Sequence, residues 1–322
     1  HKIANKYLYD KIKINFVILP RIILQPIFKF FNHKYIHKIL GKYFLSDFRH
    51  WTRHYRQNNP SQLIDIHKVL KRSNPTLSFK NSEIDNSFID LNKINLNKDD
   101  NFVCLHPRTP SYYFKRKKIK NFNYQLRDST EMNFLKSVDF LKKEKIKTVL
   151  LGEDLNNLGI NFDNFLFKSE IIRYNVSKIR SDFLDIFLLS RCKFLIGDSS
   201  GMSMAPMIFR KKSLYTNVSE LHSISFIDSF YKPLLVLKKF KSLKTNEYIP
   251  YQLVLEKKLS EFNFIYQLND IGYDVEDSTE EEIFQATKEM DHFINKNEYI
   301  NFDEKLNKKF NDILIRFDKN PL

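Results

Sequence analysis

The chain has 322 residues, of which 42% are hydrophobic and 15% aromatic, and it carries a formal net charge of +15. This length allows two domains of ordinary size, and the composition excludes a disordered, low-complexity or collagen-like chain. The two cysteines, Cys104 and Cys192, both lie in apolar runs. They predict buried free thiols in a reducing compartment, and they exclude a disulfide scaffold and a cysteine-based zinc site.

The sequence predicts neither secretion nor a span across the membrane. Its most apolar window, residues 14–31, is interrupted by Pro20, Arg21 and Pro26, which argues against a membrane-spanning helix. A secretory signal with a small-residue cleavage site is not recognisable. We therefore expect a cytoplasmic protein, and peripheral binding to the inner membrane is left open.

The charge is concentrated in two segments of opposite sign. Residues 1–59 contain twelve Lys and Arg against two Asp, a net charge of +10. Residues 270–304 contain two Lys against twelve Asp and Glu, a net charge of −10. The basic segment also carries aromatic and Ile side chains, which suits an anionic membrane surface, nucleic acid or an ordinary solvated face. No nucleic-acid-binding motif accompanies it, so we expect no nucleic-acid partner; docking of the two segments on each other is a further alternative.

In chain order, residues 1–98 predict a basic, mainly helical N-terminal region broken by prolines. Strands and helices then alternate over residues 99–240, which predicts an α/β domain with a doubly wound, Rossmann-like parallel sheet. Residues 241–322 predict a C-terminal extension, whose acidic helix we expect to pack back on the N-terminal region. The strands are expected at 101–106, 147–152, 171–174, 193–197 and 212–216, and the helices at 131–144, at 181–191, from about Met202, and from a capping box at 278–281 to about Lys296.

Polar residues follow three of these strands directly. The carboxyl ends of parallel strands share one edge of the sheet, and ligands of such folds bind just outside that edge. We therefore expect a binding site there, built from the residues after the first strand (His106, Arg108), the second strand (Gly152, Glu153) and the fourth strand (Gly197, Ser199, Ser200, Gly201).

The loop at 197–201 is the strongest candidate for anion binding. It brings consecutive backbone N–H groups and two hydroxyls to the expected start of a helix, where unsatisfied N–H groups point outward. Arg108 can add bidentate contacts to a phosphate from the facing strand end. The same loop also fits a plain helix start capped by Ser200.

Two carboxylates near the start of the helix at 181–191 are candidates for nucleotide recognition. Asp182 and Asp185 lie three residues apart and suit the N–H and hydroxyl donors of a base or ribose. They equally suit the dipole at a helix N-terminus. Walker A and Gly-x-Gly-x-x-Gly motifs are absent, and so is any Asp-x-Asp, which weighs against a metal-dependent glycosyltransferase.

Two other classes of function compete with these hypotheses. The loop at 197–201 matches Gly-x-Ser-x-Gly, the nucleophile elbow of serine hydrolases. In an esterase, Ser199 would be the nucleophile, followed by Asp228 or Asp270 and then His292. No His-Gly oxyanion loop precedes it, and Arg108 would have no use. A non-catalytic nucleotide-binding module is the third class.

Taken together, four ordered blocks resemble a family of bacterial glycosyltransferases with a GT-B-like nucleotide-sugar-binding domain. More distantly, they are similar to the GDP-fucose-dependent fucosyltransferases. The resemblance covers about residues 100 to 220 and is carried by the blocks 103–108 (Val-Cys-Leu-His-Pro-Arg), 127–134 (Arg-Asp-Ser-Thr-Glu-Met-Asn-Phe), 181–192 (Ser-Asp-Phe-Leu-Asp-Ile-Phe-Leu-Leu-Ser-Arg-Cys) and 194–203 (Phe-Leu-Ile-Gly-Asp-Ser-Ser-Gly-Met-Ser).

The resemblance implies a transferase that uses a nucleotide sugar, with GDP favoured, and needs neither metal nor cofactor. Arg108 and the Ser199–Ser200 turn would hold the donor diphosphate, and Asp185 with His106 would recognise the base. The acceptor would be a glycan or a lipid-linked sugar in surface polysaccharide synthesis. Asp128 is our candidate for the base on the acceptor hydroxyl, and the neighbouring Arg127 for a further substrate contact.

Overall fold

The computed structural model describes Tyr7 and residues 75, 77–108, 125–129, 131–153, 171–221, 233–300 and 303–318. The basic segment 1–59, apart from Tyr7, lies outside the described residues, and so does Asp228. The membrane-surface hypothesis and the division into domains therefore stay predictions. The Tyr7 ring packs edge-on against Phe183, with 4.7 Å between ring centroids.

The described elements follow the predicted alternation. The helices are α6 (Asn81–Asn92), α8 (Leu135–Lys143), α10 (Asp182–Arg191), α11 (Ala205–Ile208), α12 (Tyr251–Glu256), α13 (Ile265–Asn269), α14 (Glu280–Lys296) and α15 (Glu304–Asp318). The strands are β1 (Phe102–His106), β2 (Lys147–Leu150), β3 (Phe194–Asp198), β4 (Lys212–Val218), β5 (Leu234–Leu237), β6 (Lys239–Ser242) and β7 (Tyr273–Glu276). Short 3-10 turns cover Glu131–Phe134, Tyr174–Val176, Met202–Met204 and Leu259–Glu261.

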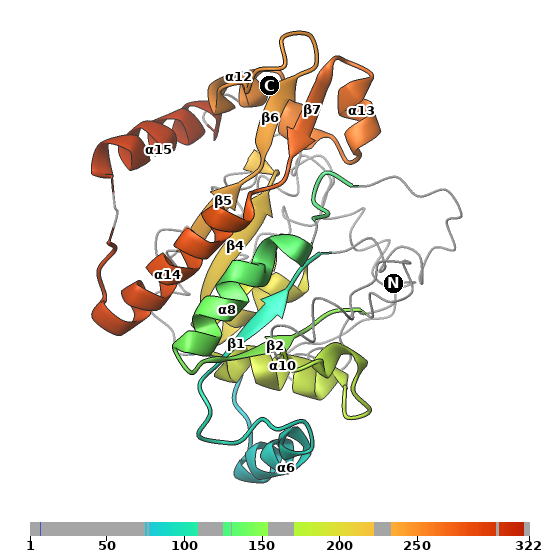
Figure 1. Ribbon diagram of the computed structural model, residues 1–322, viewed down its shortest axis with the longest axis vertical. Helices are drawn as coiled ribbons and strands as arrows, with labels where there is room; N and C mark the ends of the chain where they lie inside the picture. The colour runs from blue at the N-terminus through green and yellow to red at the C-terminus, as the bar shows by residue number, and fades with distance from the viewer. Residues whose placement is uncertain are drawn as a thin grey trace, which may run out of the picture.

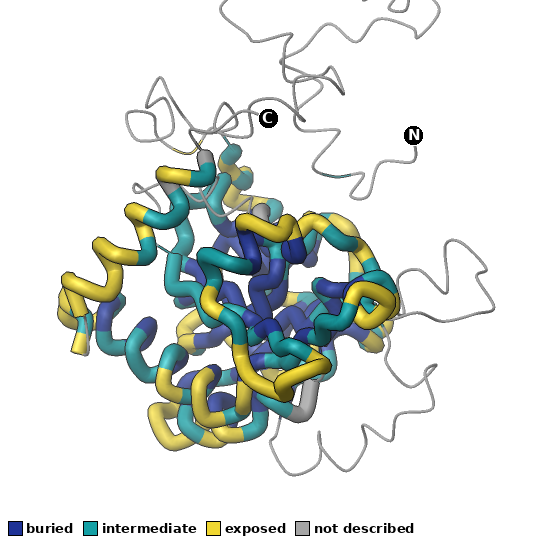
Figure 2. The backbone as a smooth tube through the Cα atoms, turned by 90° about the horizontal axis from the view of Figure 1, so that it is seen from above, coloured by how far each residue is buried: buried dark blue, intermediate teal, exposed yellow. Residues whose placement is uncertain are grey.

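Five strands form one parallel sheet in the order β2-β1-β3-β4-β5. Alternate residues of its strands enter two separate cores, because successive side chains of a strand point to opposite faces. Val103 and Leu105 of β1 pack with α8 and α14, whereas Phe102 and Cys104 pack with α10 and α6. Figure 1 shows α8 and α14 side by side on one face of the sheet. Figure 2 shows that the buried residues, in dark blue, lie in the interior of the described part of the molecule. The predicted doubly wound α/β domain is confirmed.

The strand predicted at 171–174 is wrong in extent. Only Ile172 pairs with the sheet, through a parallel bridge to Val149 of β2. The backbone N–H of Tyr174 then bonds the carbonyl of Ile172 at 2.8 Å and turns the chain into a 3-10 turn. Counted as a strand position, Ile172 completes the chain order 3-2-1-4-5-6 that is typical of dinucleotide-binding sheets. The order of the sheet reverses between β1 and β3.

The helix predicted from about Met202 begins as a 3-10 turn, and its α-helical part is short. A 3-10 turn at Met202–Met204 leads into α11, which has four residues. Arg210 adopts a left-handed φ of 60°, and the N–H of Lys211 bonds the carbonyl of Pro206, which ends the helix. A helix of this length has little dipole, so the expected anion site at its N-terminus loses that support.

The C-terminal residues pack on the sheet domain in two ways. The elements β6, β7, α12, α13 and α15 form a third apolar core against the ends of β4 and β5, at the far end of the molecule from α6 (Figure 1). The acidic helix α14 starts one residue later than predicted: Thr279 is the N-cap, and Glu282 closes the capping box. Ser278 instead bonds elsewhere, because its N–H donates to Asn217 Oδ1 at 2.8 Å and its hydroxyl donates to the carbonyl of Leu237 at 3.4 Å. Packing of α14 on residues 1–98 stays a prediction.

Because Ile283 of α14 is wholly buried in the core between α8 and the sheet, its truncation tests whether this helix belongs to the domain. Ile283→Ala should lower the free energy of unfolding by about 2–5 kcal/mol. Leu306→Ala, at a side chain that is 63% exposed, should cost less than about 0.5 kcal/mol. Urea denaturation measures both, and equal costs would remove α14 from the core.

Candidate functional site

A buried carboxylate joins the strand ends where the site was predicted. Asp198, the last residue of β3, is fully buried. It accepts hydrogen bonds from the backbone N–H of Arg108 (2.8 Å) and from the side chains of Ser129 (2.5 Å), Thr216 (2.7 Å) and Asn217 (3.0 Å). These donors follow β1, lie in the loop at 125–129 and belong to β4. One carboxylate therefore fixes three neighbouring segments at the carboxyl edge of the sheet.

The carboxylate of Asp198 points into the protein and not toward the surface of the loop, where a ligand would bind. Burial raises the pKa of this carboxyl, and the hydrogen bonds from Ser129, Arg108, Thr216 and Asn217 act in the opposite direction. Since its oxygens face these internal donors, the carboxylate does not compete with a ligand anion at the surface of the loop. The sequence places Asp198 within the loop at 197–201 but does not show which way its side chain points.

Arg108 lies where the order of the sheet reverses, and its guanidinium is held from the loop at 125–129. Its Nη2 donates to Gln125 Oε1 at 2.7 Å, and its Nε lies 3.7 Å from Asp128 Oδ1. The Arg108 side chain is 10% exposed. A guanidinium restrained in this way is pre-organised, so that little side-chain entropy is lost when an anion binds.

Asp128 is buried behind Arg108, with only 1% of its side chain exposed. Its Oδ2 accepts from the N–H of Gln125 at 3.0 Å, and its carbonyl accepts from the buried amine of Lys238 at 2.5 Å. Burial raises the pKa of the carboxyl, whereas the charge of Arg108 acts to lower it. The predicted role as a base on the acceptor is untested, but this burial favours another role, which is to orient Arg108.

His106 is enclosed by two of the predicted site glycines. A Cβ on Gly197 would lie 2.8 Å from the backbone oxygen of His106, and a Cβ on Gly152 would lie 3.4 Å from the imidazole ring. Gly152 also has a φ of 102°, which favours glycine. The histidine is 8% exposed, and its Nδ1 lies 3.4 Å from the Ser200 hydroxyl. Both glycines therefore make room for the histidine, in a chain with six glycines in all.

The Ser199 hydroxyl contacts a residue that sequence analysis missed. It donates to Glu220 Oε2 at 3.0 Å, and Glu220 Oε1 lies 3.5 Å from Arg127 Nε. Glu220 follows β4, the strand beside β3, so the rule that ligands bind at strand ends could have found it. Gly201 is exposed, with no atom near its missing Cβ, and leaves the mouth of the loop open.

The predicted pair of aspartates is split by the fold. Asp182 is exposed, whereas Asp185 is buried and lies 3.9 Å from Arg180 Nε. A second carboxylate, Glu153, lies 3.7 Å from Arg180 Nη2. Arg180, which the sequence did not single out, thus links the end of β2 to the start of α10. Burial raises the pKa of Asp185.

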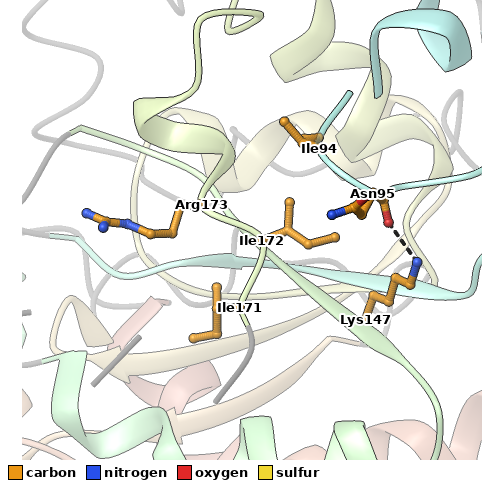
Figure 3. Close-up of a pocket in the computed structure, with 6 residues that line it drawn as sticks. All are labelled: Ile94, Asn95, Lys147, Ile171, Ile172 and Arg173. Carbon is orange, nitrogen blue, oxygen red and sulfur yellow. Dashed lines mark hydrogen bonds between the residues drawn. The ribbon is translucent and has the colours of Figure 1, made fainter. Parts of the chain in front are cut away.

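A pocket of about 560 Å³ lies elsewhere, beside β2 (Figure 3). It is lined by Ile94, Asn95, Lys147, Ile171, Ile172 and Arg173. The Lys147 amine inside it already bonds the carbonyl of Asn95 and the carboxylate of Asp100, each at 2.7 Å. None of the lining residues is among the predicted site residues, so we do not assign this pocket to the candidate site.

The strand ends thus gather most of the predicted site residues, with Asp182 at the rim.

Across the described ranges, no group of three or more His, Cys, Asp or Glu side chains is suited to hold a metal ion. No described helix is long and apolar enough to cross a membrane. Both predicted buried thiols, Cys104 and Cys192, are confirmed. Of the residues considered for an esterase, His292 lies in α14, and its Nε2 is 3.6 Å from Oε1 of Glu298, just beyond the end of that helix.

No protein-family model and no curated protein matches the chain. Among solved structures, the chain is similar to the wall teichoic acid polymerase TagF, with 12% identity and a TM-score of 0.29. The similarity covers 74% of this chain and 48% of the polymerase, so the chain spans about half the length of that protein. A likeness of this extent leaves the function to be argued from the residues of the site.

His106 gives the site a measurable pH signature. Burial, and next the charge of Arg108, lower the pKa of His106 from 6.5 to about 4. Because the unfolded chain binds this proton more readily, the neutral ring contributes stability above pH 6.5 that is lost as the pH falls toward 4. In NMR titrations, the His106 ring signal should move only below about pH 5.

The signal is assigned by its loss in His106→Gln. The unfolding free energy of this variant should depend less on pH between 6.5 and 4 than that of the natural chain. A midpoint above about pH 6 would contradict the buried, neutral histidine.

Proposed function

We propose that this protein transfers a sugar from a nucleotide-sugar donor, with GDP favoured, to a glycan or lipid-linked acceptor in surface polysaccharide synthesis, without a metal ion. The observation that carries the proposal is the meeting of Arg108 and the Ser199–Ser200 turn between β1 and β3, joined by Asp198. In doubly wound sheets, ligands bind where the strand order reverses, outside the carboxyl ends. A guanidinium and two hydroxyls at that position suit a diphosphate.

In the proposed sugar transfer, the protein must stabilise the negative charge of the departing nucleoside diphosphate. Arg108 supplies a fixed positive charge for this purpose, in place of a metal ion, and loop N–H groups with Ser199 and Ser200 add hydrogen bonds. Asp128 and Gln125 hold the guanidinium in place from behind. In this proposal Asp128 is a positioning residue for Arg108, and Glu153 and Asp182 are candidates to contact the nucleoside.

Two observations count against the alternative of a serine esterase. The Ser199 hydroxyl bonds a carboxylate, Glu220, and not a histidine. A nucleophile elbow strains the backbone of its serine, and Ser199 is not among the described residues with a positive φ. Covalent labelling of Ser199 by a fluorophosphonate probe would favour the esterase. A binding module, the third class, would bind nucleotide and transfer no sugar to any acceptor.

Replacing Arg108 tests the diphosphate site. Arg108→Ala should weaken GDP binding about 10- to 100-fold, the effect of losing hydrogen bonds to a charged group. Ser199→Ala should have a smaller effect, and Arg108→Lys an intermediate one, because the ammonium keeps the charge without the fork. Isothermal titration calorimetry measures the affinities, with and without EDTA.

The matched control is Arg316→Ala, at an exposed arginine of α15, which should bind GDP as the natural chain does. EDTA should leave the affinity unchanged. Binding that requires Mn²⁺ or Mg²⁺ would overturn the metal-free mechanism, and equal affinities of the Arg108 and Arg316 variants would overturn the site.

A further inference from the structure

The carboxylate of Glu220 engages two of the donors that the proposed site offers to a phosphate. One oxygen accepts from the Ser199 hydroxyl at 3.0 Å, and the other lies 3.5 Å from Arg127 Nε. These donors come from different segments, the loop after β3 and the loop at 125–129. A hydroxyl and a guanidinium that converge on one anion form the kind of group that also binds phosphate oxygens.

The two carboxylates beside the site arginines differ in their freedom to move. Asp128, the partner of Arg108, is 1% exposed and is fixed by the N–H of Gln125. Glu220, the partner of Arg127, is 27% exposed and lies beyond the end of β4. A partly exposed glutamate can turn into water at little desolvation cost, whereas the buried aspartate cannot.

Arg127 and Arg108 are also linked through the same short loop. Gln125 and Asp128 hold Arg108, and Arg127 lies between them in the chain. Each of these two arginines has a carboxylate partner near the carboxyl edge, Asp128 for Arg108 and Glu220 for Arg127. If Glu220 turned away, the edge would gain one net positive charge at Arg127 and one free hydroxyl donor at Ser199.

We propose that Glu220 is a stand-in for a substrate phosphate, and that a phosphate group of the donor binds Ser199 and Arg127 by displacing its carboxylate. This inference rests on the proposed function and adds a determinant of specificity to it. A singly charged anion gains little over the carboxylate that it replaces, whereas a pyrophosphate group carries more charge and, in the proposed site, also binds Arg108. Glu220 thus discriminates against small anions by competing for their donors.

The test compares anion affinities by isothermal titration calorimetry with inorganic phosphate, inorganic pyrophosphate and GDP. Glu220→Gln should bind pyrophosphate and GDP at least about tenfold more tightly than the natural chain, the size of one charge-assisted contact. It should also gain measurable binding of inorganic phosphate. Glu220→Ala should show the same direction, which keeps the test valid if the glutamine retains a hydrogen bond to Ser199.

The matched control is Glu144→Gln, which makes the same change of charge at an exposed residue between α8 and β2, at the opposite edge of the sheet. It separates local competition from the effect of net charge. Adding Ser199→Ala to Glu220→Gln should remove most of the gain, because the donor that Glu220 occupies is then missing.

Each outcome has a distinct meaning. If the natural chain binds GDP and Glu220→Gln binds it no better than Glu144→Gln, or more weakly, the stand-in role is overturned and the proposed function stands. If neither the natural chain nor the Glu220 variants bind pyrophosphate or GDP, the diphosphate site fails, and this inference fails with it.

Discussion

The site depends on one buried carboxylate and its four donors. Asp198 ends β3 and holds the chain after β1, the loop at 125–129 and β4 in one arrangement. A charge buried in this way is costly unless it is fully hydrogen-bonded, so loss of a single donor leaves the others unable to compensate. The network extends through Asn217, which bonds Ser278 at the start of α14, and it couples the position of Arg108 to the packing of the domain.

Much of the fold could be predicted because buried parallel strands read as short apolar runs. Four of the five predicted strands lie where periodicity placed them, and α10 and α14 end as expected. The errors occur where local hydrogen bonds compete with regular structure. A 3-10 turn at Met202–Met204 replaces the expected start of an α-helix, and the turn at Tyr174 reduces a strand to one bridge. The strand β5 has the composition of the others but was not recognised.

The sequence predicts which segments form the candidate site, but not the side-chain contacts within it. The rule for strand ends gathers His106, Arg108 and the loop at 197–201, because backbone topology alone decides where they lie. It cannot say that Asp198 faces inward, or that Glu220 and Arg180 bind residues far from them in sequence. Those contacts depend on side-chain directions and loop paths, which no periodicity encodes. The burial of Asp128 beside Arg108 could not be predicted for the same reason.

The packing of α14 on one face of the sheet has a consequence for folding during synthesis on the ribosome. Val103, Leu105, Phe194 and Ile196 emerge long before residues 280–296, which bury them. Until then, α8 is the only other described helix that packs on this face of the nascent sheet, and exposed apolar faces promote aggregation. A chain released before α14 is complete would lack this cover, so translation arrest late in the message should yield insoluble fragments.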